Sequence, residues 1–287
     1  MYPYEILPGI DMYVICLSLA ALSAIIIYRL LADRAKIGAR LQNLCIFTAI
    51  GAIAFGYLSA VFFQAFYNIK KYGKFVINSS TGATFYGGLI GGALFFLLVY
   101  FLVGKKIFPD GRHKKSFFTI ADIAACCIAI AHALGRVGCL MVGCCYGKET
   151  DAWYGIYMVD LEKKVIPTQL FEAIFLLILF AVFVLMVKNK MTYCLQIYLC
   201  AYGVWRFIIE YFRDDYRGTT IIEATTPSQL TAIFMVAAGI LLIVLQRKLQ
   251  TAGAVEVKAD KDQDEEYEYA EDYEYDYGEK KEEDEQK

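Results

Sequence analysis

Charged and hydroxyl side chains recur at helical spacing in an apolar stretch around residue 206. Tyr202, Arg206 and Glu210 follow one another at intervals of four residues, so they share one face of a helix. At about 1.5 Å per residue, Arg206 lies about 10 Å deeper in the stretch than Arg213. A charge inside a membrane span costs about 2.5–3.5 kcal/mol and normally faces protein or water. We therefore expect Arg206 to bind a phosphate-like anion through paired N–H donors, with an ion pair to Glu210 as the structural alternative.

A second arginine, Arg136, stands near the end of another apolar stretch. His132 precedes it by four residues and shares its helix face. The sequence leaves two interpretations of His132 open, a packed core side chain or a functional residue beside the arginine. Asp122, at the opposite end of the stretch, is expected to cap a helix start.

Glycine-rich or polar blocks open three other apolar stretches, at residues 86–92, 167–172 and 227–230. In the first block the glycines at positions 87, 88, 91 and 92 are spaced for close helix packing. Tyr86 is either an anchor at the membrane interface or part of a site. The second block, Pro-Thr-Gln-Leu-Phe-Glu, places Gln169 and Glu172 in a first helical turn.

The nine cysteines do not form the framework of a disulfide-rich fold. Six of them lie inside apolar stretches and are interpreted as small hydrophobic residues. Cys139, Cys144 and Cys145 instead follow Arg136 in a glycine-rich segment. A zinc site would need a fourth ligand and usually a second, closely spaced pair, which the segment lacks. A disulfide or a buried cluster of thiols is therefore expected there, ahead of a metal site or a nucleophile.

Helices long enough to cross a membrane must position these residues. A bilayer core is crossed by about 20 mostly apolar residues in a helix. Hydrophobic residues make up 58% of the chain, and suitable runs occur at 11–31, 43–66, 84–104, 118–137, 167–187, 193–213 and 227–246. They predict an all-α integral membrane protein with seven transmembrane helices over residues 1–250. Residues 1–5 lack the basic region of a signal peptide, so the first run is expected to remain as a span.

Basic residues flank the runs unevenly, which predicts the orientation in the membrane. The loops after the odd-numbered runs carry most of them, for example Arg34, Arg112 and Lys188, although Lys70, Lys71 and Lys74 lie on the other side. The N-terminus is therefore expected outside and the C-terminus in the cytoplasm. With that topology, the unusual residues of runs 3 to 7 gather at the outer leaflet.

The last part of the chain differs sharply from the rest. From Val255 onward it holds 16 acidic residues, 5 lysines and 5 tyrosines. Such a composition cannot bury a core. Residues 251–287 are therefore predicted to form a disordered, acidic, tyrosine-rich cytoplasmic tail.

The motifs together resemble those of the prolipoprotein diacylglyceryl transferases. The signature of that family is similar to residues 135–147, which run from Gly135-Arg136-Val137-Gly138 through Gly143 to Gly147. Residues 87–91, 167–172 and 206–213 resemble further blocks of the family, in its order. The resemblance covers roughly residues 10–246. The family fold is a seven-helix membrane bundle with its N-terminus outside, which agrees with the topology expected above.

The resemblance implies a transferase in the bacterial cytoplasmic membrane, with no metal and no cofactor. It would move the diacylglyceryl group of phosphatidylglycerol to the lipobox cysteine thiol of a prolipoprotein and release glycerol phosphate. The implied partners are phosphatidylglycerol, lipobox peptides and membrane lipid, not nucleic acid. The implied catalytic residues are Tyr86, His132, Arg136 and Arg206. The implied substrate-binding residues are Gly87, Gly88, Cys139, Cys144, Gly147, Gln169, Glu172, Tyr202, Glu210 and Arg213.

Three positions depart from the family pattern. Tyr86 stands where the family has a histidine, and Cys139 and Cys144 stand where it has an asparagine and a glutamate. A tyrosine, with an ordinary pKa of about 10, is a poor base. We therefore hypothesise that His132 carries the proton and that Tyr86 donates a hydrogen bond. Two alternatives stay open: a transferase with another acceptor that uses Cys139 or Cys144 as a covalent relay, and a non-catalytic lipid or solute translocator on the same scaffold.

Overall fold

The computed structural model describes residues 9–73, 81–214 and 226–251, together with residues 6, 75, 77 and 78. Within these ranges the side chains of residues 70–72, 85, 86, 160, 250 and 251 are not described. The predictions for residues 1–5 and for the acidic tail beyond residue 251 lie outside the described residues.

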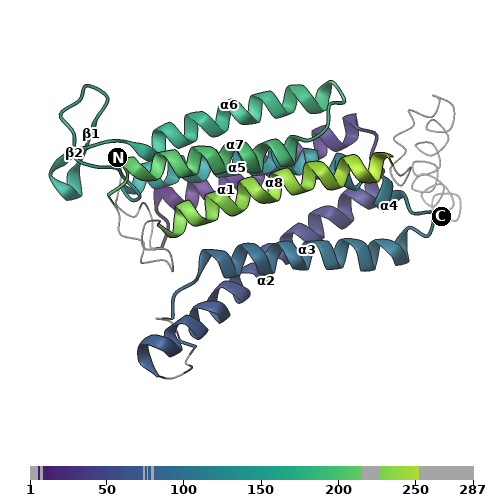
Figure 1. Cartoon of the computed structure of the whole chain (residues 1–287), viewed down its shortest axis with the longest axis horizontal. Coiled ribbons are helices and arrows are strands. Elements are labelled where there is room, and N and C mark those ends of the chain that lie inside the picture. The colour runs from purple at the N-terminus through teal and green to yellow at the C-terminus, as the bar shows by residue number, and fades with distance from the viewer. Residues whose placement is uncertain are drawn as a thin grey trace, which may run out of the picture. The chain divides into compact units, whose positions relative to one another are not determined.

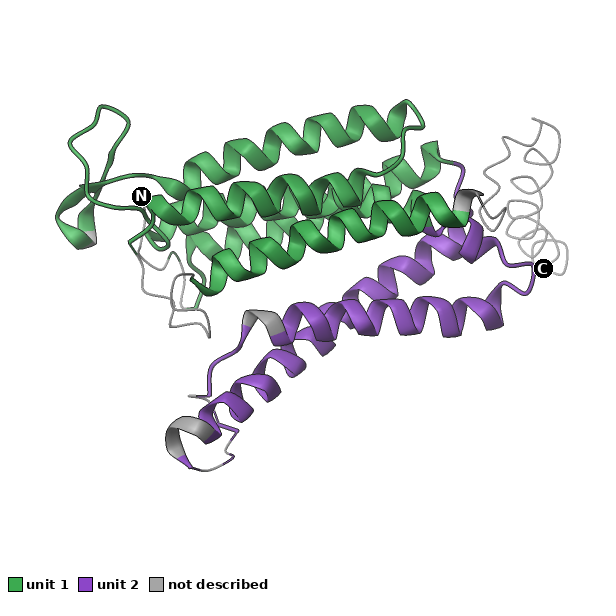
Figure 2. Ribbon diagram, in the orientation of Figure 1, with its two compact units in different colours: residues 1–35, 118–256 green, residues 36–117, 257–287 purple. Residues whose placement is uncertain are grey.

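The described chain is almost entirely helical and divides into two compact units (Figure 1, Figure 2). Unit 1 comprises residues 1–35 and 118–256, and unit 2 comprises residues 36–117 and 257–287. The long helices of unit 1 are α1 (Met12–Arg34), α5 (Phe117–Val142), α6 (Thr168–Lys188), α7 (Cys194–Ile209) and α8 (Pro227–Thr251). Unit 2 contains α2 (Ala39–Tyr72), α3 (Phe85–Ile107) and the short α4 (Arg112–Lys115).

Six of the described helices are long and apolar enough to cross a membrane, so the chain is an integral membrane protein. The spans are Met12–Arg34, Ala39–Ile69, Gly87–Ile107, Phe117–Val142, Thr168–Lys188 and Pro227–Leu249. Outward-facing leucines and isoleucines such as Leu22, Ile178 and Leu241 are more than half exposed, as expected of side chains that face lipid. These spans match the first five predicted runs and the last.

The predicted run at 193–213 differs from the other six. Its helix α7 has 16 residues and then tightens into the 3₁₀ turn η2 (Glu210–Phe212). A helix of that length measures about 24 Å, less than the roughly 30 Å of a bilayer core. The polar residues from Tyr202 onward shorten the apolar part of this run. The described residues thus supply six such spans, not seven, and a crossing by α7 stays a prediction.

Small residues let the helices of unit 1 approach closely. Figure 1 shows α1, α5, α6, α7 and α8 side by side. A Cβ added to Gly138 of α5 would lie 3.0 Å from the ring of Tyr13 on α1. A Cβ added to Gly203 of α7 would lie 2.9 Å from the carbonyl oxygen of Ala232 on α8. Side chains larger than hydrogen would force these pairs apart.

Asp122 caps a helix, but not the one in which it lies. Its Oδ1 accepts a hydrogen bond of 2.7 Å from the backbone N–H of Cys194, the first residue of α7. The sequence predicted a capping role at the start of its own stretch. Asp122 is buried, so the cap also joins α5 to α7 inside unit 1.

A small hairpin follows α5 and was not predicted from the sequence. Strands β1 (Ile156–Met158) and β2 (Lys163–Val165) pair antiparallel with Ile156 opposite Val165, and the 3₁₀ turn η1 (Val159–Leu161) joins them. Isolated bridges connect Gly147 with Arg213 and Glu149 with Val165. The segment between α5 and α6 is therefore tied to the end of η2, and the all-α prediction holds apart from this hairpin.

In unit 2 the glycines of α3 pack against α2, as their spacing predicted. A Cβ on Gly56 of α2 would lie 2.9 Å from the carbonyl oxygen of Gly88, and one on Gly92 would lie 3.0 Å from that of Ala52. A Cβ on Gly87 would lie 2.7 Å from the Cβ of Phe63. The glycine block thus brings two membrane helices into backbone contact.

Candidate functional site

The first part of the site is an ion pair between α5 and α6. Arg136 lies in the last two turns of α5, and Glu172 lies one turn inside α6, which begins just after Pro167. The Nε of Arg136 lies 3.0 Å from the Oε1 of Glu172. Glu172 is fully buried, and its Oε2 accepts no hydrogen bond from any described residue. The two predicted blocks at 135–147 and 167–172 therefore meet at this pair.

Tyr202 and His132 extend the pair into a hydrogen-bonded chain. The hydroxyl of Tyr202, on α7, donates to Glu172 Oε1 at 2.6 Å. His132 Nε2 lies 3.4 Å from the Tyr202 hydroxyl and 3.8 Å from Glu172 Oε1. Its Nδ1 lies 3.0 Å from the hydroxyl of Tyr198. His132 is thus placed within a polar cluster and is in line for proton exchange with Tyr202.

Arg206 forms the second part of the site. Its Nη2 lies 2.8 Å from Glu210 Oε2, so the ion pair that was the structural alternative is present. The same nitrogen donates at 2.8 Å to the hydroxyl of Ser228 in the first turn of α8. Both Arg206 and Arg136 interact electrostatically with Glu172 and Tyr202. The guanidinium groups of the buried Arg206 and the half-buried Arg136 therefore act on one set of polar side chains.

Two residues of this polar site, Tyr198 and Thr226, were not identified from the sequence. Tyr198 continues the stripe of Tyr202, Arg206 and Glu210 by one interval of four, so the same spacing rule could have found it. Thr226 donates to Glu210 Oε1 at 2.9 Å and precedes α8, where no periodic signal marks it.

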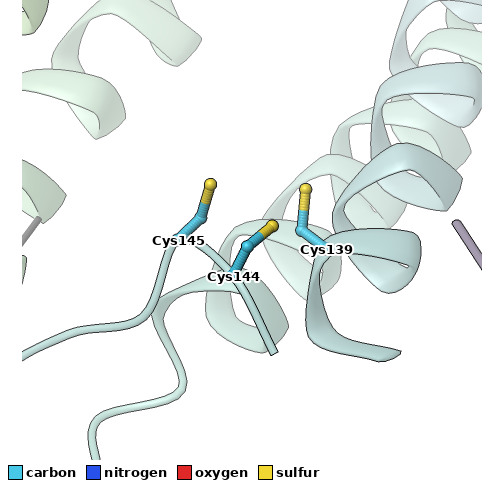
Figure 3. A group of neighbouring side chains, drawn as sticks. All are labelled: Cys139, Cys144 and Cys145. Carbon is cyan, nitrogen blue, oxygen red and sulfur yellow. The ribbon is translucent and has the colours of Figure 1, made fainter. Parts of the chain in front are cut away.

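Three cysteines gather beyond Arg136 at the end of α5 (Figure 3). The Sγ atoms of Cys139, Cys144 and Cys145 all lie within 4.8 Å of one another, and all three thiols are free. The backbone returns toward α5 because Gly143 and Cys145 adopt positive φ angles of 76° and 64°. The predicted cluster of thiols is present and no disulfide joins them, but the prediction that the cluster is buried is wrong, because Cys144 is exposed and Cys139 and Cys145 are half-buried.

The first turn of α6 holds the cysteine loop in place. Thr168 donates at 2.9 Å to the carbonyl oxygen of Cys145, and the buried Gln169 donates its amide to that of Cys144. Hydrogen bonds from the neighbouring thiols, and then the guanidinium of Arg213, lower the pKa of Cys145 below its ordinary value. Gln169, predicted to bind substrate, therefore positions the loop that carries the thiols.

Gly147 and Arg213 meet behind this loop. Gly147 donates its N–H to the carbonyl oxygen of Ile166 at 2.9 Å, and its bridge partner is Arg213. A Cβ at this position would lie 2.6 Å from the carbonyl oxygen of Phe212 and 2.9 Å from that of Ile166. The backbone carbonyl groups on both sides of Gly147 thus leave no room for a side chain, which explains why this residue is a glycine. Gly147 fixes the course of the chain and brings Arg213 to the cysteines.

The remaining predicted site residues lie in unit 2. Gly87 and Gly88 contact α2 through Phe63 and Ala60. Tyr86 lies in the first turn of α3, and its side chain is outside the described part of the structure. The roles predicted for these three residues therefore stay predictions.

Comparison with known proteins identifies relatives over most of the chain. A family model described as prolipoprotein diacylglyceryl transferase matches residues 5–245. Phosphatidylglycerol–prolipoprotein diacylglyceryl transferase 2 of Clostridium perfringens is 34% identical over 169 residues, which cover 56% of this chain and 61% of the relative. The phosphatidylglycerol–prolipoprotein diacylglyceryl transferase of Clostridium tetani is 29% identical over 212 residues, covering 71% of this chain and 80% of the relative.

Proposed function

Because the chain belongs to the prolipoprotein diacylglyceryl transferase family, we propose that it transfers the diacylglyceryl group of phosphatidylglycerol to the lipobox cysteine thiol of prolipoproteins. The chain is a multi-pass protein of the cytoplasmic membrane. Transfer would take place at the outer leaflet, with the N-terminus outside and the C-terminus in the cytoplasm. The observation that carries the proposal is the pair of arginines, the half-buried Arg136 and the buried Arg206, each held by its own glutamate.

The arginines suit the phosphate of phosphatidylglycerol. A guanidinium carries five N–H donors in a rigid, planar fork. This fork matches the geometry of phosphate and binds phosphate oxygens in pairs. Glu172 Oε2 is a buried acceptor without a described donor, and leaving such a group unsatisfied costs about 1–3 kcal/mol. A hydroxyl of the glycerol headgroup would satisfy it, which favours this lipid over one without headgroup hydroxyls.

The reaction breaks a carbon–oxygen bond of the lipid and forms a carbon–sulfur bond. As the bond to oxygen breaks, negative charge collects on the leaving glycerol phosphate. Cations already in place in a site of low dielectric constant stabilise that charge without having to reorganise. Arg136 and Arg206 perform this role in the proposal.

The acceptor thiol must lose its proton before it attacks, since the thiolate is the nucleophile. His132 takes that proton in the proposal, because its Nε2 lies beside the hydroxyl of Tyr202 and the carboxylate of Glu172. The proton then passes to the leaving phosphate, so no proton is gained or lost over the reaction. Tyr86 would donate a hydrogen bond to the substrate.

The test is the mass of a lipobox peptide incubated with the purified protein in phosphatidylglycerol liposomes. We expect an adduct of one diacylglyceryl group on the cysteine, and none on a peptide with Cys→Ser. Arg206→Lys keeps the positive charge but loses the paired N–H donors of the guanidinium, so this variant should lose most of the transfer activity. Arg112→Ala is the control, since it removes an exposed arginine side chain from unit 2, and it should keep the transfer activity. The absence of any adduct from the folded protein would refute the proposal.

The role of His132 is tested in the same assay by comparing the transfer rates of two variants. His132→Ala should lower the rate by about two to four orders of magnitude, as loss of a general base does. Tyr86→Phe removes a single hydroxyl and should cost less. Full activity in His132→Ala together with inactivity in Tyr86→Phe would reverse the two roles.

A further inference from the structure

The cluster of Cys139, Cys144 and Cys145 lies directly beside the arginine site. Cys139 follows Arg136 by three residues, so it lies one helical turn further along α5, and the two side chains interact electrostatically. The loop with the other two cysteines is held by the first turn of α6, the same turn that leads to Glu172. The thiols are therefore anchored to the two helices that form the Arg136–Glu172 pair.

We propose that this cluster binds one zinc ion through three thiolates and that the fourth position on the zinc takes the acceptor cysteine thiol. The inference rests on the proposed transfer to a thiol. Tetrahedral zinc with bonds of about 2.3 Å to sulfur places the sulfur atoms about 3.8 Å apart. The three Sγ atoms already lie within 4.8 Å of one another, and Cys144 is exposed. A movement of about 1 Å of the loop cysteines toward Cys139 therefore closes the site.

The number of ligands points to chemistry at the metal, not to a structural role. Structural zinc sites have four protein ligands, whereas catalytic sites have three and keep a position open for water or substrate. Among the residues that the structure describes, no imidazole or carboxylate atom joins the three sulfur atoms. A ligand supplied by the substrate thus completes the tetrahedron.

Zinc would supply the thiolate that the transfer needs. A thiol that binds the metal loses its proton, because a coordinating thiol is deprotonated. The proton passes to His132, the zinc-bound sulfur attacks the glycerol carbon, and the bond from that carbon to the phosphate oxygen breaks. The product sulfur is a neutral thioether, which has lost the negative charge that held it on zinc, and it leaves.

The charges around the cluster suit such a complex. Zinc with three thiolates carries one negative charge, and a fourth thiolate adds a second. The buried Arg213 interacts with Cys145 through a side-chain hydrogen bond, and Arg136 interacts with Cys139. These guanidinium groups offset the negative charge of the complex.

Metal binding is tested on the full-length protein, purified under reducing conditions and loaded with zinc or with cobalt as a spectroscopic probe. We expect one equivalent of zinc per chain and, with cobalt, thiolate-to-metal charge-transfer bands. Both should be lost in Cys144→Ser and Cys145→Ser and kept in Cys200→Ser, a matched variant on α7 outside the cluster. Less than stoichiometric zinc in the wild type, or cobalt bands that persist in Cys144→Ser, would overturn the proposal.

A measurement on the wild type alone covers the case in which a serine variant does not fold. Peptide mapping after N-ethylmaleimide treatment should show Cys139, Cys144 and Cys145 protected by zinc and alkylated after chelation. Recovery of any two of them as a disulfide from the reduced, zinc-loaded protein would contradict a three-thiolate site.

The open position is tested with a lipobox peptide and the cobalt-loaded protein in the absence of phosphatidylglycerol. A fourth bond from cobalt to sulfur should raise the charge-transfer absorbance by about one third, and the Cys→Ser peptide should leave it unchanged. If the charge-transfer absorbance does not change when the cysteine peptide is added, the metal has only a structural role and the proposal is overturned.

Three results separate this inference from the proposed function. Transfer that proceeds at full rate after removal of zinc would refute the zinc site and leave the transferase proposal intact. Coordination of the peptide without any transfer would support the zinc site and refute the transferase. A diacylglyceryl adduct on a cysteine of the protein itself would indicate a covalent relay and overturn the zinc-thiolate step.

Discussion

Replacing Glu172 by glutamine tests whether the ion pair with Arg136 holds the site together. The pair is nearly excluded from water, with side-chain exposures of 16% for Arg136 and 0% for Glu172. Breaking a buried pair costs about 3–5 kcal/mol, because the remaining charge is left without a partner. Glutamine still accepts the hydrogen bond from Tyr202, and Arg136 keeps some contact with solvent, so we expect the lower value, about 3 kcal/mol.

The chain offers a matched control on its surface. Lys163 and Glu149 of the hairpin segment form a pair with the same 3.0 Å separation, but their side chains are 58% and 65% exposed. Exposed pairs contribute little, since water and salt screen them. Glu149→Gln should therefore leave the unfolding midpoint where it is.

The assay is thermal unfolding in lipid nanodiscs without phosphatidylglycerol, so that bound substrate does not add to stability. At about 2–4 °C per kcal/mol, Glu172→Gln should lower the midpoint by about 6–12 °C. The double variant Arg136→Met with Glu172→Gln removes both charges and should recover much of that loss without recovering transfer. Equal midpoints for the two glutamine variants, or a double variant less stable than Glu172→Gln, would refute the reasoning.

Two further substitutions test contacts that position the site, in the same unfolding assay. Gly147→Ala places a Cβ against the carbonyl oxygens of Phe212 and Ile166 and should lower the free energy of unfolding by about 1–3 kcal/mol. Gly135→Ala is the control, because a Cβ there meets nothing within 4 Å, and it should not lower the midpoint. Equal effects of the two substitutions would contradict the packing argument. Asp122→Ala removes the cap on α7 and should cost about 1–2 kcal/mol. Asp122→Asn keeps an acceptor and should cost less, and an Asp122→Ala variant as stable as the wild type would argue against the cap.

The helical part of the site could be predicted from the sequence because one helix fixes its own geometry. Tyr202, Arg206 and Glu210 share a face whatever surrounds them, and the structure indeed joins Arg206 to Glu210. The pairing of Arg136 with Glu172 depends on two helices, and here the resemblance to a family placed both residues in one site before their contact was known.

Contacts between distant segments could not be read from spacing. Asp122 caps α7 through Cys194, which is 72 residues away, and no local pattern marks that partner. The strands of the hairpin have three residues each, too few for an alternating pattern to stand out. The distances among the three thiols could not be read from spacing for a similar reason. Cys139 reaches Cys144 and Cys145 because the loop after α5 turns back on the helix.

The charge balance of the two arginines and two glutamates explains why the proposed transfer would need a proton carrier inside the site. Arg136 and Arg206 are matched by Glu172 and Glu210, so these four side chains are neutral together before substrate arrives. The phosphodiester adds one negative charge, and the departing glycerol phosphate would add a second unless it gains a proton. Two arginines would hold such a dianion tightly and slow its release. In the proposed reaction the thiol proton, passed through His132, would remove that second charge, so one proton transfer would both activate the nucleophile and free the product.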